Sequence, residues 1–229
     1  MNDIALNWKL NKMQVLAFHI MVTQFWHILQ HGHEKEINKK PLHIFLEGLG
    51  GTGKTHILKA LQNLMCIFGC AHRIHFLAPT GGAAALVDGQ TIHKGLGLSV
   101  CHHNQNKLEQ KDKDLTYHLT TKKQEELRLE WHDIDFVAID EVSMASVQLL
   151  AELDASLWYA CEEFCDDWFG GINIIFSGDF YQHPPVLACP LYVPIWIRVR
   201  SVPHQEALAH FGCLAWKQVN MVLQFTEQK

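Results

Sequence analysis

The sequence predicts an α/β fold in which helices cover both faces of a parallel sheet. Four short apolar runs of strand length alternate with stretches of helical periodicity, and this alternation is typical of a parallel sheet covered on both sides. A glycine-rich stretch, GLGGTGKT, follows the first run and precedes a helical stretch. A chain of 229 residues is long enough for one such domain with a buried core, and short for two.

The expected elements follow in order along the chain. Residues 10–31 carry apolar side chains at helical spacing and predict an amphipathic helix. The apolar run 42–47 predicts the first strand, and residues 54–69 predict a helix that ends near Gly69. The later elements are expected as a strand within 73–80, a short helix at 81–89, and strands at 135–141 and 172–179.

Composition divides the chain into three parts. A helical segment (1–34) precedes a central domain (35–189), and a tail (190–229) mixes apolar and basic residues without a readable pattern. Within the central domain, residues 101–132 are charged and almost free of aliphatic runs. This composition predicts a surface insertion that becomes helical toward its end.

Charge and cysteine content exclude several classes of protein. The net charge of −5 at pH 7 argues against a polybasic protein, so nucleic acid would bind to a local surface. No apolar run approaches the roughly 18 residues of a membrane span, so no membrane partner is expected. The N-terminus lacks a secretory apolar core, and the seven cysteines are expected as reduced thiols. Cys66/Cys70 and Cys161/Cys165 lie in apolar, helix-like sequence, where we expect burial and not metal binding.

The glycine-rich stretch has the complete phosphate-loop pattern, Gly48-x4-Gly53-Lys54-Thr55, which predicts a P-loop NTPase. Glycines let the backbone curl so that its N–H groups point at phosphate oxygens, and the following helix adds its positive end. Lys54 would reach the β- and γ-phosphates of ATP, and the Thr55 hydroxyl would hold Mg²⁺. The residues expected to bind the nucleotide are Gly48, Gly50, Gly51, Thr52, Gly53, Lys54 and Thr55. A chance glycine-rich turn, the alternative, does not explain the full pattern between a strand and a helix.

Two acidic residues follow the third predicted strand. Asp140 and Glu141 end the run FVAIDE, and a phosphate loop needs an acid on a neighbouring strand to hold its metal ion. Asp140 would bind Mg²⁺, directly or through water, and Glu141 would orient and deprotonate the attacking water. An Asp-Glu pair favours hydrolysis over transfer to a small acceptor. The alternative is that the two carboxylates cap a helix.

A polar residue follows the fourth predicted strand. In FSGDFYQHPPV (176–186), Gly178 and Asp179 end the strand, and Gln182 precedes two prolines. Ligands of open α/β sheets bind at the carboxyl ends of the strands, so Gln182 would lie where it can sense the γ-phosphate. Taken alone, the segment would be an ordinary turn.

Together, these segments resemble the Pif-one family of DNA helicases. The blocks GLGGTGKT, LAPTGGAAALV, TIHKGLGL, VAIDEVSM and FGGINIIFSGDFYQHPPV occur in the family's order and approximate spacing. The family belongs to the 5′-to-3′ branch of helicase superfamily one and is related to RecD. The phrasing is most similar to Pif-like helicases of eukaryotes, including those carried by Helitron transposons. The resemblance covers roughly residues 6–186 and, more weakly, 206–228.

The resemblance implies roles for two glutamines. Gln14, in LNKMQVLAF, would hydrogen-bond the adenine edge, and the alternative is a simple polar position on an amphipathic helix. Gln182 matches the family's γ-phosphate sensor, which links nucleotide state to the grip on DNA. His183 replaces the leucine usual before the two prolines, which predicts a local change in packing and not loss of sensing.

Two further blocks resemble the family's contacts to single-stranded DNA. APTGGAA would contact the DNA backbone, with Pro79, Thr80 and Gly81 nearest. In TIHKGLG, Thr91 and His93 would contact DNA or brace the loop. A buried, hydrogen-bonded His93 is an equal alternative.

The resemblance implies an ATP-dependent DNA helicase whose RecA-like ATPase domain spans residues 35–189 and uses ATP and Mg²⁺ on single-stranded DNA. A role in DNA repair, recombination and telomere maintenance would follow for the family, in the nucleus or the mitochondrion. The first 30 residues contain no arginine, so no mitochondrial presequence is evident, and the nucleus is the expected compartment.

The family's motor has two RecA-like domains, and the second supplies arginines that stabilise the transferring phosphoryl group. The tail AWKQVNMVLQFTEQK resembles the approach to that second domain, but Lys229 cannot form the same bidentate clamp as an arginine. We therefore expect a truncated first motor domain that binds ATP·Mg²⁺ weakly and hydrolyses it slowly, unless a second RecA-like domain joins in trans. The alternative is a nucleotide-binding pseudo-helicase without turnover. A small-molecule P-loop kinase fits poorly, because no lid or acceptor-site pattern is present.

Overall fold

A computed structural model describes residues 2–32, 40–98, 121–161, 167–193 and 203–228. Its centre is a six-stranded sheet with the strand order β3-β2-β4-β5-β1-β6, and every neighbouring pair is parallel. The strands are β1 (His43–Gly48), β2 (Ile74–Ala78), β3 (Gln90–Thr91), β4 (Phe136–Ile139), β5 (Asn173–Gly178) and β6 (Met221–Phe225). The predicted parallel α/β sheet is confirmed.

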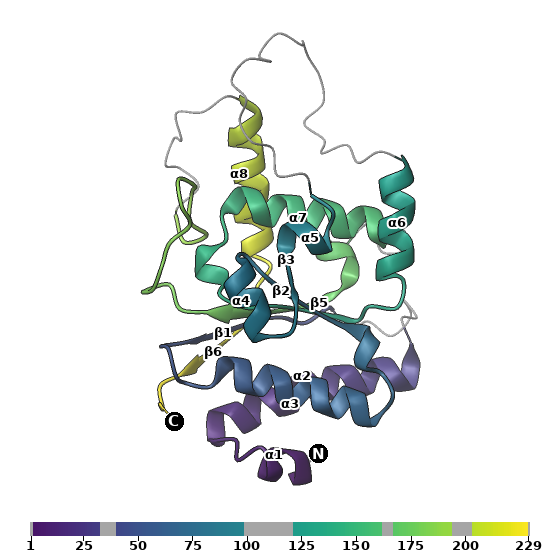
Figure 1. The fold of residues 1–229 in the computed structure, drawn as a ribbon, viewed down its shortest axis with the longest axis vertical. Coiled ribbons are helices and arrows are strands. Elements are labelled where there is room, and N and C mark those ends of the chain that lie inside the picture. Colours follow the sequence, from purple (N-terminus) through teal and green to yellow (C-terminus); the bar gives the residue numbers. More distant parts are fainter. Residues whose placement is uncertain (1, 33–39, 99–120, 162–166, 194–202, 229) are drawn as a thin grey trace.

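Helices lie on both faces of the sheet (Figure 1). One layer consists of α1 (Asn2–Asn7), α2 (Lys12–His31) and α3 (Lys54–Ile67). The other consists of α5 (Ile92–Gly95), α6 (Thr121–Trp131), α7 (Val147–Ala160) and α8 (Pro203–Trp216). The short α4 (Gly81–Leu86) and the 3-10 turns η1 (Ala71–Arg73), η2 (Val142–Met144) and η4 (Trp168–Gly171) connect these elements.

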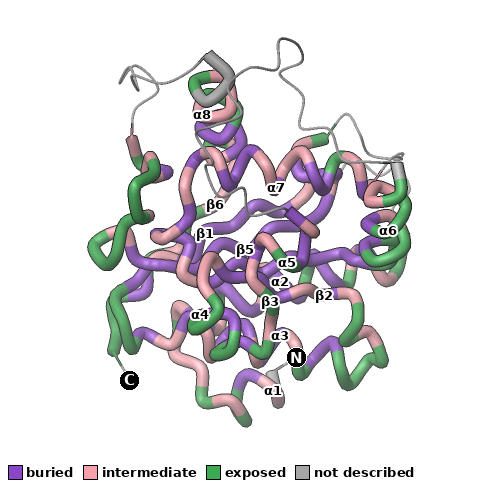
Figure 2. Tube along the Cα trace, turned by 45° about the horizontal axis from the view of Figure 1, so that its top comes forward, coloured by how far each residue is buried: buried purple, intermediate pink, exposed green. Residues whose placement is uncertain are grey.

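The central strands are mostly apolar because both of their faces are buried. In β1, Ile44 and Leu46 pack toward α2 and α3, whereas Phe45 packs toward α7 and α8. Successive strand residues point to opposite faces, so each central strand contributes side chains to the hydrophobic cores on both sides of the sheet. Figure 2 shows the sheet as the buried centre of the molecule. Among the described residues, no helix is both long enough and apolar enough to span a bilayer.

Helix α2 begins directly after its N-cap residue, Asn11. The Asn11 side chain accepts a hydrogen bond from the Gln14 backbone N–H (2.9 Å), and the Gln14 side chain accepts one from the Asn11 N–H (3.0 Å). This reciprocal pair is a capping box, which satisfies two donors that the first helical turn leaves unpaired. The helix predicted over 10–31 is therefore confirmed as α2.

The other predicted elements are also confirmed, with bounds within a few residues: β1, α3, β2, α4, β4 and β5. Local sequence patterns did not predict α7, α8 or β6. In the structure, β6 pairs with β1 from Ile44↔Met221 to Gly48↔Phe225, and α8 packs on α7. The tail therefore adds an edge strand and a helix to the same sheet.

Two expectations need correction. The charged segment 101–132 is not entirely a surface feature: α6 buries Leu127 and Trp131, and the Trp131 indole donates to the Gly95 carbonyl (3.3 Å). Residues 99–120 lie outside the described part. Cys66 is exposed and not buried, because the buried face of α3 carries its neighbour Met65 and the next residue turns about 100° away.

The other two described cysteines of the predicted pairs are only partly buried. Cys70 and Cys161 are half-buried free thiols, and Cys165 lies outside the described residues. Within the described ranges, no three His, Cys, Asp or Glu side chains are grouped so as to hold a metal ion.

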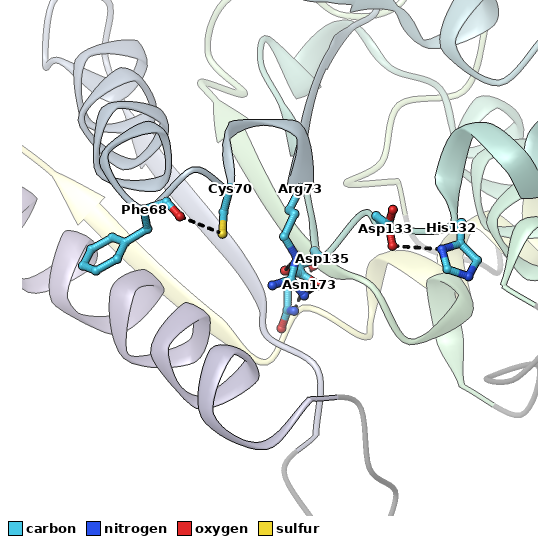
Figure 3. Close-up of polar contacts among 7 residues, drawn as sticks. All are labelled: Phe68, Cys70, Arg73, His132, Asp133, Asp135 and Asn173. Carbon is cyan, nitrogen blue, oxygen red and sulfur yellow. Dashed lines mark hydrogen bonds and ion pairs between the residues drawn. The ribbon is translucent and has the colours of Figure 1, made fainter.

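A polar network ties the amino ends of the strands together (Figure 3). Arg73, before β2, makes a two-pronged ion pair with the buried Asp135, before β4 (2.7 and 2.9 Å). The Asp135 carbonyl accepts from the Asn173 side chain (2.9 Å), whose own oxygen accepts from the Leu42 N–H and from Gln24 (2.8 and 2.9 Å). This network aligns β1, β2, β4 and β5 at the edge opposite the predicted site.

Candidate functional site

The predicted site residues meet at the carboxyl ends of three adjacent strands. Gly48 ends β1, Asp140 directly follows β4, and Asp179 directly follows β5. These strands are neighbours in the order β4-β5-β1. Because parallel strands end at one edge, segments far apart in sequence are brought to one place.

The loop between β1 and α3 has the backbone of a phosphate loop. Gly51 and Gly53 have φ angles of 81° and 80°, which favour glycine strongly over residues with a Cβ. A Cβ on Gly53 would also overlap the side-chain amide of Gln14. At Gly48, a Cβ would lie 2.7 Å from both the Phe225 carbonyl oxygen and the Thr52 hydroxyl. Backbone conformation therefore favours glycine at positions 51 and 53, and close packing favours it at positions 48 and 53.

Lys54 is the first residue of α3, and its ammonium group turns back over the loop. It is 8% exposed and donates to the carbonyl oxygens of Gly48 and Leu49 (2.5 and 3.1 Å). Burial lowers the pKa of Lys54, while nearby Glu141 and Asp140 act in the opposite direction. A partly desolvated cation is thus held beside the carboxylates at this edge.

The Asp140 carboxylate accepts hydrogen bonds from three residues of the site. Its Oδ2 accepts from the Thr55 hydroxyl (2.9 Å), and its Oδ1 accepts from the Ser177 hydroxyl (2.8 Å) and the Glu141 N–H (3.0 Å). The residue is 4% exposed. Hydrogen bonds to a carboxylate are about twice as strong as those between neutral groups, so three donors hold its orientation firmly.

Glu141 follows Asp140 in an unusual backbone conformation. Its φ and ψ are 52° and 43°, in the left-handed region, which costs a residue with a side chain about 1 kcal/mol or more. Burial raises the pKa of the half-buried Glu141 carboxyl, and the Asp140 charge raises it further. Such a carboxylate binds a proton more readily than an exposed one, as a general base requires.

The segment after β5 places Gln182 against the phosphate loop. The Asp179 carboxylate accepts from the Tyr181 N–H (3.0 Å), and the Asp179 carbonyl accepts from the Gln182 N–H (3.0 Å). In this tight turn the exposed Gln182 points its side-chain nitrogen to within 3.3 Å of where a Cβ on Gly50 would stand. The structure brings Gln182 to the loop, and its contact with a γ-phosphate stays a prediction.

Gln14 also lies on the phosphate loop, but its amide is engaged there. It is fully buried, its Nε2 donates to the Thr52 carbonyl (2.9 Å), and its Oε1 belongs to the capping box. His56, on α3, lies 2.7 Å from the Trp8 carbonyl oxygen through its Nε2. In this structure Gln14 braces the loop from α2, and its contact with adenine stays a prediction.

A family model described as PIF1-like helicase matches residues 23–195, which is most of the chain. The chain belongs to the PIF1-like helicase family. Curated relatives include the ATP-dependent DNA helicase RRM3 of Saccharomyces cerevisiae, 32% identical over 163 residues, and the ATP-dependent DNA helicase PIF1 of the same species, 34% identical over 150 residues. These alignments cover 69% and 64% of this chain, but only 21% and 16% of the two yeast proteins.

Solved structures of PIF1-like helicases share the fold. Pif1 helicase from Candida albicans matches with a TM-score of 0.61 at 20% identity, covering 96% of this chain and 40% of that one. Bacteroides Pif1, solved in complex with ADP-AlF3 and single-stranded DNA, matches with a TM-score of 0.55 at 25% identity, covering 85% of this chain and 40% of that one. The described part of the chain therefore has the fold of one part of these helicases.

The residues predicted to contact DNA lie at the same carboxyl edge of this PIF1-like domain. Pro79 and the half-buried Thr80 follow β2, and the Thr80 hydroxyl caps α4 by accepting from the Ala83 N–H (3.3 Å). Thr91 caps α5 in the same way, accepting from the Lys94 N–H (3.3 Å).

Two more predicted DNA contacts lie beside these caps. His93 is half-buried in α5, and Gly81 is exposed at the start of α4. The contacts of all these residues with DNA stay predictions.

Two residues of the PIF1-like site had no predicted role. Ser177 is fully buried and orients Asp140, and Asp179 is buried and anchors the Gln182 turn. A serine inside an otherwise apolar strand was the available signal, because a buried hydroxyl needs a hydrogen-bond partner. The sequence does not say which partner it has.

Proposed function

We propose that the chain is the first motor domain of a PIF1-like DNA helicase, which binds ATP with Mg²⁺ and hydrolyses it. One observation carries the proposal: the Thr55 hydroxyl and the Asp140 carboxylate, 85 positions apart, lie 2.9 Å from each other. Hydroxyl and carboxylate oxygens suit Mg²⁺, so the residues present fit this ion. Thr55 and Asp140 would hold it, and when bound it neutralises charge on the phosphates.

The protein's own groups divide the remaining work. Backbone N–H groups of the loop would bind phosphate oxygens, and Lys54 would exchange its carbonyl partners for them. Glu141 would accept the proton of the attacking water. Gln182 would contact the γ-phosphate from across the loop.

Single-stranded DNA is the proposed partner. The blocks around Thr80 and Thr91 share the carboxyl edge with the nucleotide site, and a Bacteroides relative was solved with single-stranded DNA bound. Coupling of hydrolysis to translocation and unwinding belongs to this proposal, as does a second RecA-like domain acting in trans. The nucleus, with the mitochondrion as the alternative, is the proposed compartment.

The test is steady-state ATP hydrolysis by the chain, with and without single-stranded DNA. Lys54→Ala is expected to reduce turnover about 100-fold, because the variant loses a charge-assisted contact with the phosphates. Lys59→Ala is the matched control, since it removes a 40%-exposed lysine from the same helix. Equal turnover in both variants would contradict the proposal.

Nucleotide binding is measured in parallel by calorimetry. Binding without turnover in the unmodified chain, at every DNA concentration, would favour a nucleotide-binding module over an ATPase. Stimulation of turnover by DNA is the expected result.

A further inference from the structure

An aromatic cluster lies beneath the turn that carries Gln182. Phe180, in that turn, is half-buried and packs against the core between the sheet and α7. Its ring centroid lies close to three others: 5.3 Å from Phe45, 5.5 Å from Trp216 and 5.6 Å from Tyr192. Tilted and edge-to-face rings at these separations attract each other beyond the area they bury.

Trp216, at the end of α8, is the shared member of the cluster. Besides Phe180, its ring lies 5.4 Å from Phe45 and 5.1 Å from Phe176, both edge-to-face. Phe45 belongs to β1, which leads into the phosphate loop, and Phe176 belongs to β5, which leads into the Gln182 turn. The cluster therefore joins α8 to two of the three strands whose carboxyl ends form the nucleotide site.

Helix α8, which carries Trp216, packs closely against α7. A Cβ on Gly212 would overlap the Val147 carbonyl oxygen, so α8 approaches the start of α7 as closely as a glycine allows. The Val147 N–H donates to the Cys189 carbonyl (3.0 Å), in the segment that follows the Gln182 turn. The stretch from Phe180 to Cys189, which includes Gln182, is thus held at both ends.

The turn presents two different faces. Phe180 points into the core, whereas its neighbour Tyr181 is 88% exposed and Gln182 reaches toward Gly50 of the phosphate loop. Only Tyr181 separates Gln182 from Phe180 along the chain. A displacement of Gln182 on nucleotide binding would therefore move Phe180. Packed aromatic rings transmit such displacement because protein interiors are dense.

We propose that Phe180 and Trp216 are positioning residues that hold Gln182 over the phosphate loop and connect its position to α8. The inference rests on the proposed function, since Gln182 is taken there as the γ-phosphate sensor. It adds that discrimination between ATP and ADP depends on two aromatic side chains that do not contact the nucleotide.

The first experiment compares affinities for ADP and for a non-hydrolysable ATP analogue, measured by calorimetry on the whole chain. Phe180→Leu is expected to lower the preference for the ATP analogue roughly tenfold, the loss of one hydrogen bond to a charged phosphate, while ADP affinity stays unchanged. Trp216→Ala should act in the same way, and Trp216→Phe should restore the preference. A merely structural role would lower the melting temperature and leave the ratio of the two affinities unchanged, which would overturn the inference.

The second experiment uses Trp216 as a probe. Tryptophan emission of the unmodified chain should differ between the two nucleotide complexes, and Trp216→Phe or Gln182→Ala should abolish the difference. Trp158→Phe is the matched control, because Trp158 lies on α7, is 44% exposed and contacts Tyr159, and there the difference should persist. If the emission is equal in both complexes, the inference is overturned, whereas the proposed function is not affected.

The two proposals fail in different ways. If neither nucleotide binds the unmodified chain, the proposed function fails and the inference fails with it. If both bind and Phe180→Leu keeps the affinity ratio, only the inference fails. Because Trp216→Ala removes a large ring and can unfold the chain, Phe180→Leu is the deciding variant.

Discussion

At the scale of single residues, Ser177 orients Asp140, the proposed Mg²⁺ ligand. Its hydroxyl donates to Asp140 Oδ1 at 2.8 Å, and loss of such an outer-shell partner typically costs about 10–100-fold in metal affinity. Ser177→Ala is therefore expected to raise, about tenfold, the Mg²⁺ concentration needed for tight nucleotide binding. The measurement is a calorimetric titration with ADP at increasing Mg²⁺.

Ser156→Ala is the control for that substitution. Ser156 is also fully buried, but its hydroxyl has no hydrogen-bond partner within the described structure, so its removal should leave the Mg²⁺ dependence unchanged. An equal shift in both variants would show that Ser177 acts through general packing and not through Asp140.

Residue identity predicted which side chains lie together at the site better than it predicted the contacts that support them. Lys54, Thr55 and Asp140 could be assigned because phosphate and Mg²⁺ restrict the residue types at fixed spacings. The Ser177 contact depends on which strands are neighbours, and short motifs do not encode strand order. Gln14 shows the same limit, since its position on the phosphate loop required the packing of α2 against α3.

At the scale of elements, the ion pair between Arg73 and Asp135 at the amino ends of the strands is expected to affect stability and not nucleotide binding. Asp135 is fully buried, whereas Asp133, two residues earlier and visible in the same view, is 70% exposed beside His132 (Figure 3). Asp135→Ala leaves Arg73 without its carboxylate and is expected to lower the free energy of unfolding by about 3 kcal/mol. Asp133→Ala should cost less than about 1 kcal/mol. Urea denaturation measures both, and a loss of nucleotide affinity in folded Asp135→Ala would contradict the separation of the two edges.

Another element-scale prediction concerns the contact between α7 and η4. Burial raises the pKa of Asp154 from its ordinary 3.8 to about 6, although the Phe169 N–H donates to the carboxylate (2.7 Å) and opposes this. Between these pH values the folded chain binds a proton that the unfolded chain does not, so stability falls as pH rises through about 6. Asp154→Asn keeps an acceptor for Phe169 and should stabilise the chain at pH 7.5 by on the order of 1 kcal/mol, after allowance for solvent screening.

The pH dependence is the decisive readout for Asp154. Urea denaturation at pH 5 and pH 7.5 should give a larger gain for Asp154→Asn at the higher pH. Asp88→Asn, at a side chain that is 78% exposed, should show no such difference. A gain for Asp154→Asn that is the same at both pH values would mean that the carboxyl does not titrate with the raised pKa.

At the scale of the whole molecule, the tail was the part that the sequence described least. Strand β6 is only five residues long and partly exposed at the edge of the sheet, so it lacks the continuous apolar run that identified β1, β4 and β5. Helix α8 is recognised from its packing on α7. Its Gly212 is explained by the close approach to Val147, which the sequence alone does not show. Pairing with β1 and packing on α7 are tertiary facts, which local periodicity does not contain.

The structure therefore predicts that the chain is one folding unit that includes its tail. A chain ending after Val193 would lose Phe225, Ala215 and Cys213 from the core, where they are 2%, 0% and 8% exposed. It would also leave β1, the strand that carries the phosphate loop, as an open edge that invites aggregation. We expect no cooperative thermal unfolding from such a chain by circular dichroism. Removal of 226–229 is the control, because residues 226–228 are exposed, and it should unfold like the full chain. Cooperative unfolding of 1–193 at an unchanged temperature would instead support the division at residue 189 that composition suggests, with the tail as a separate appendage.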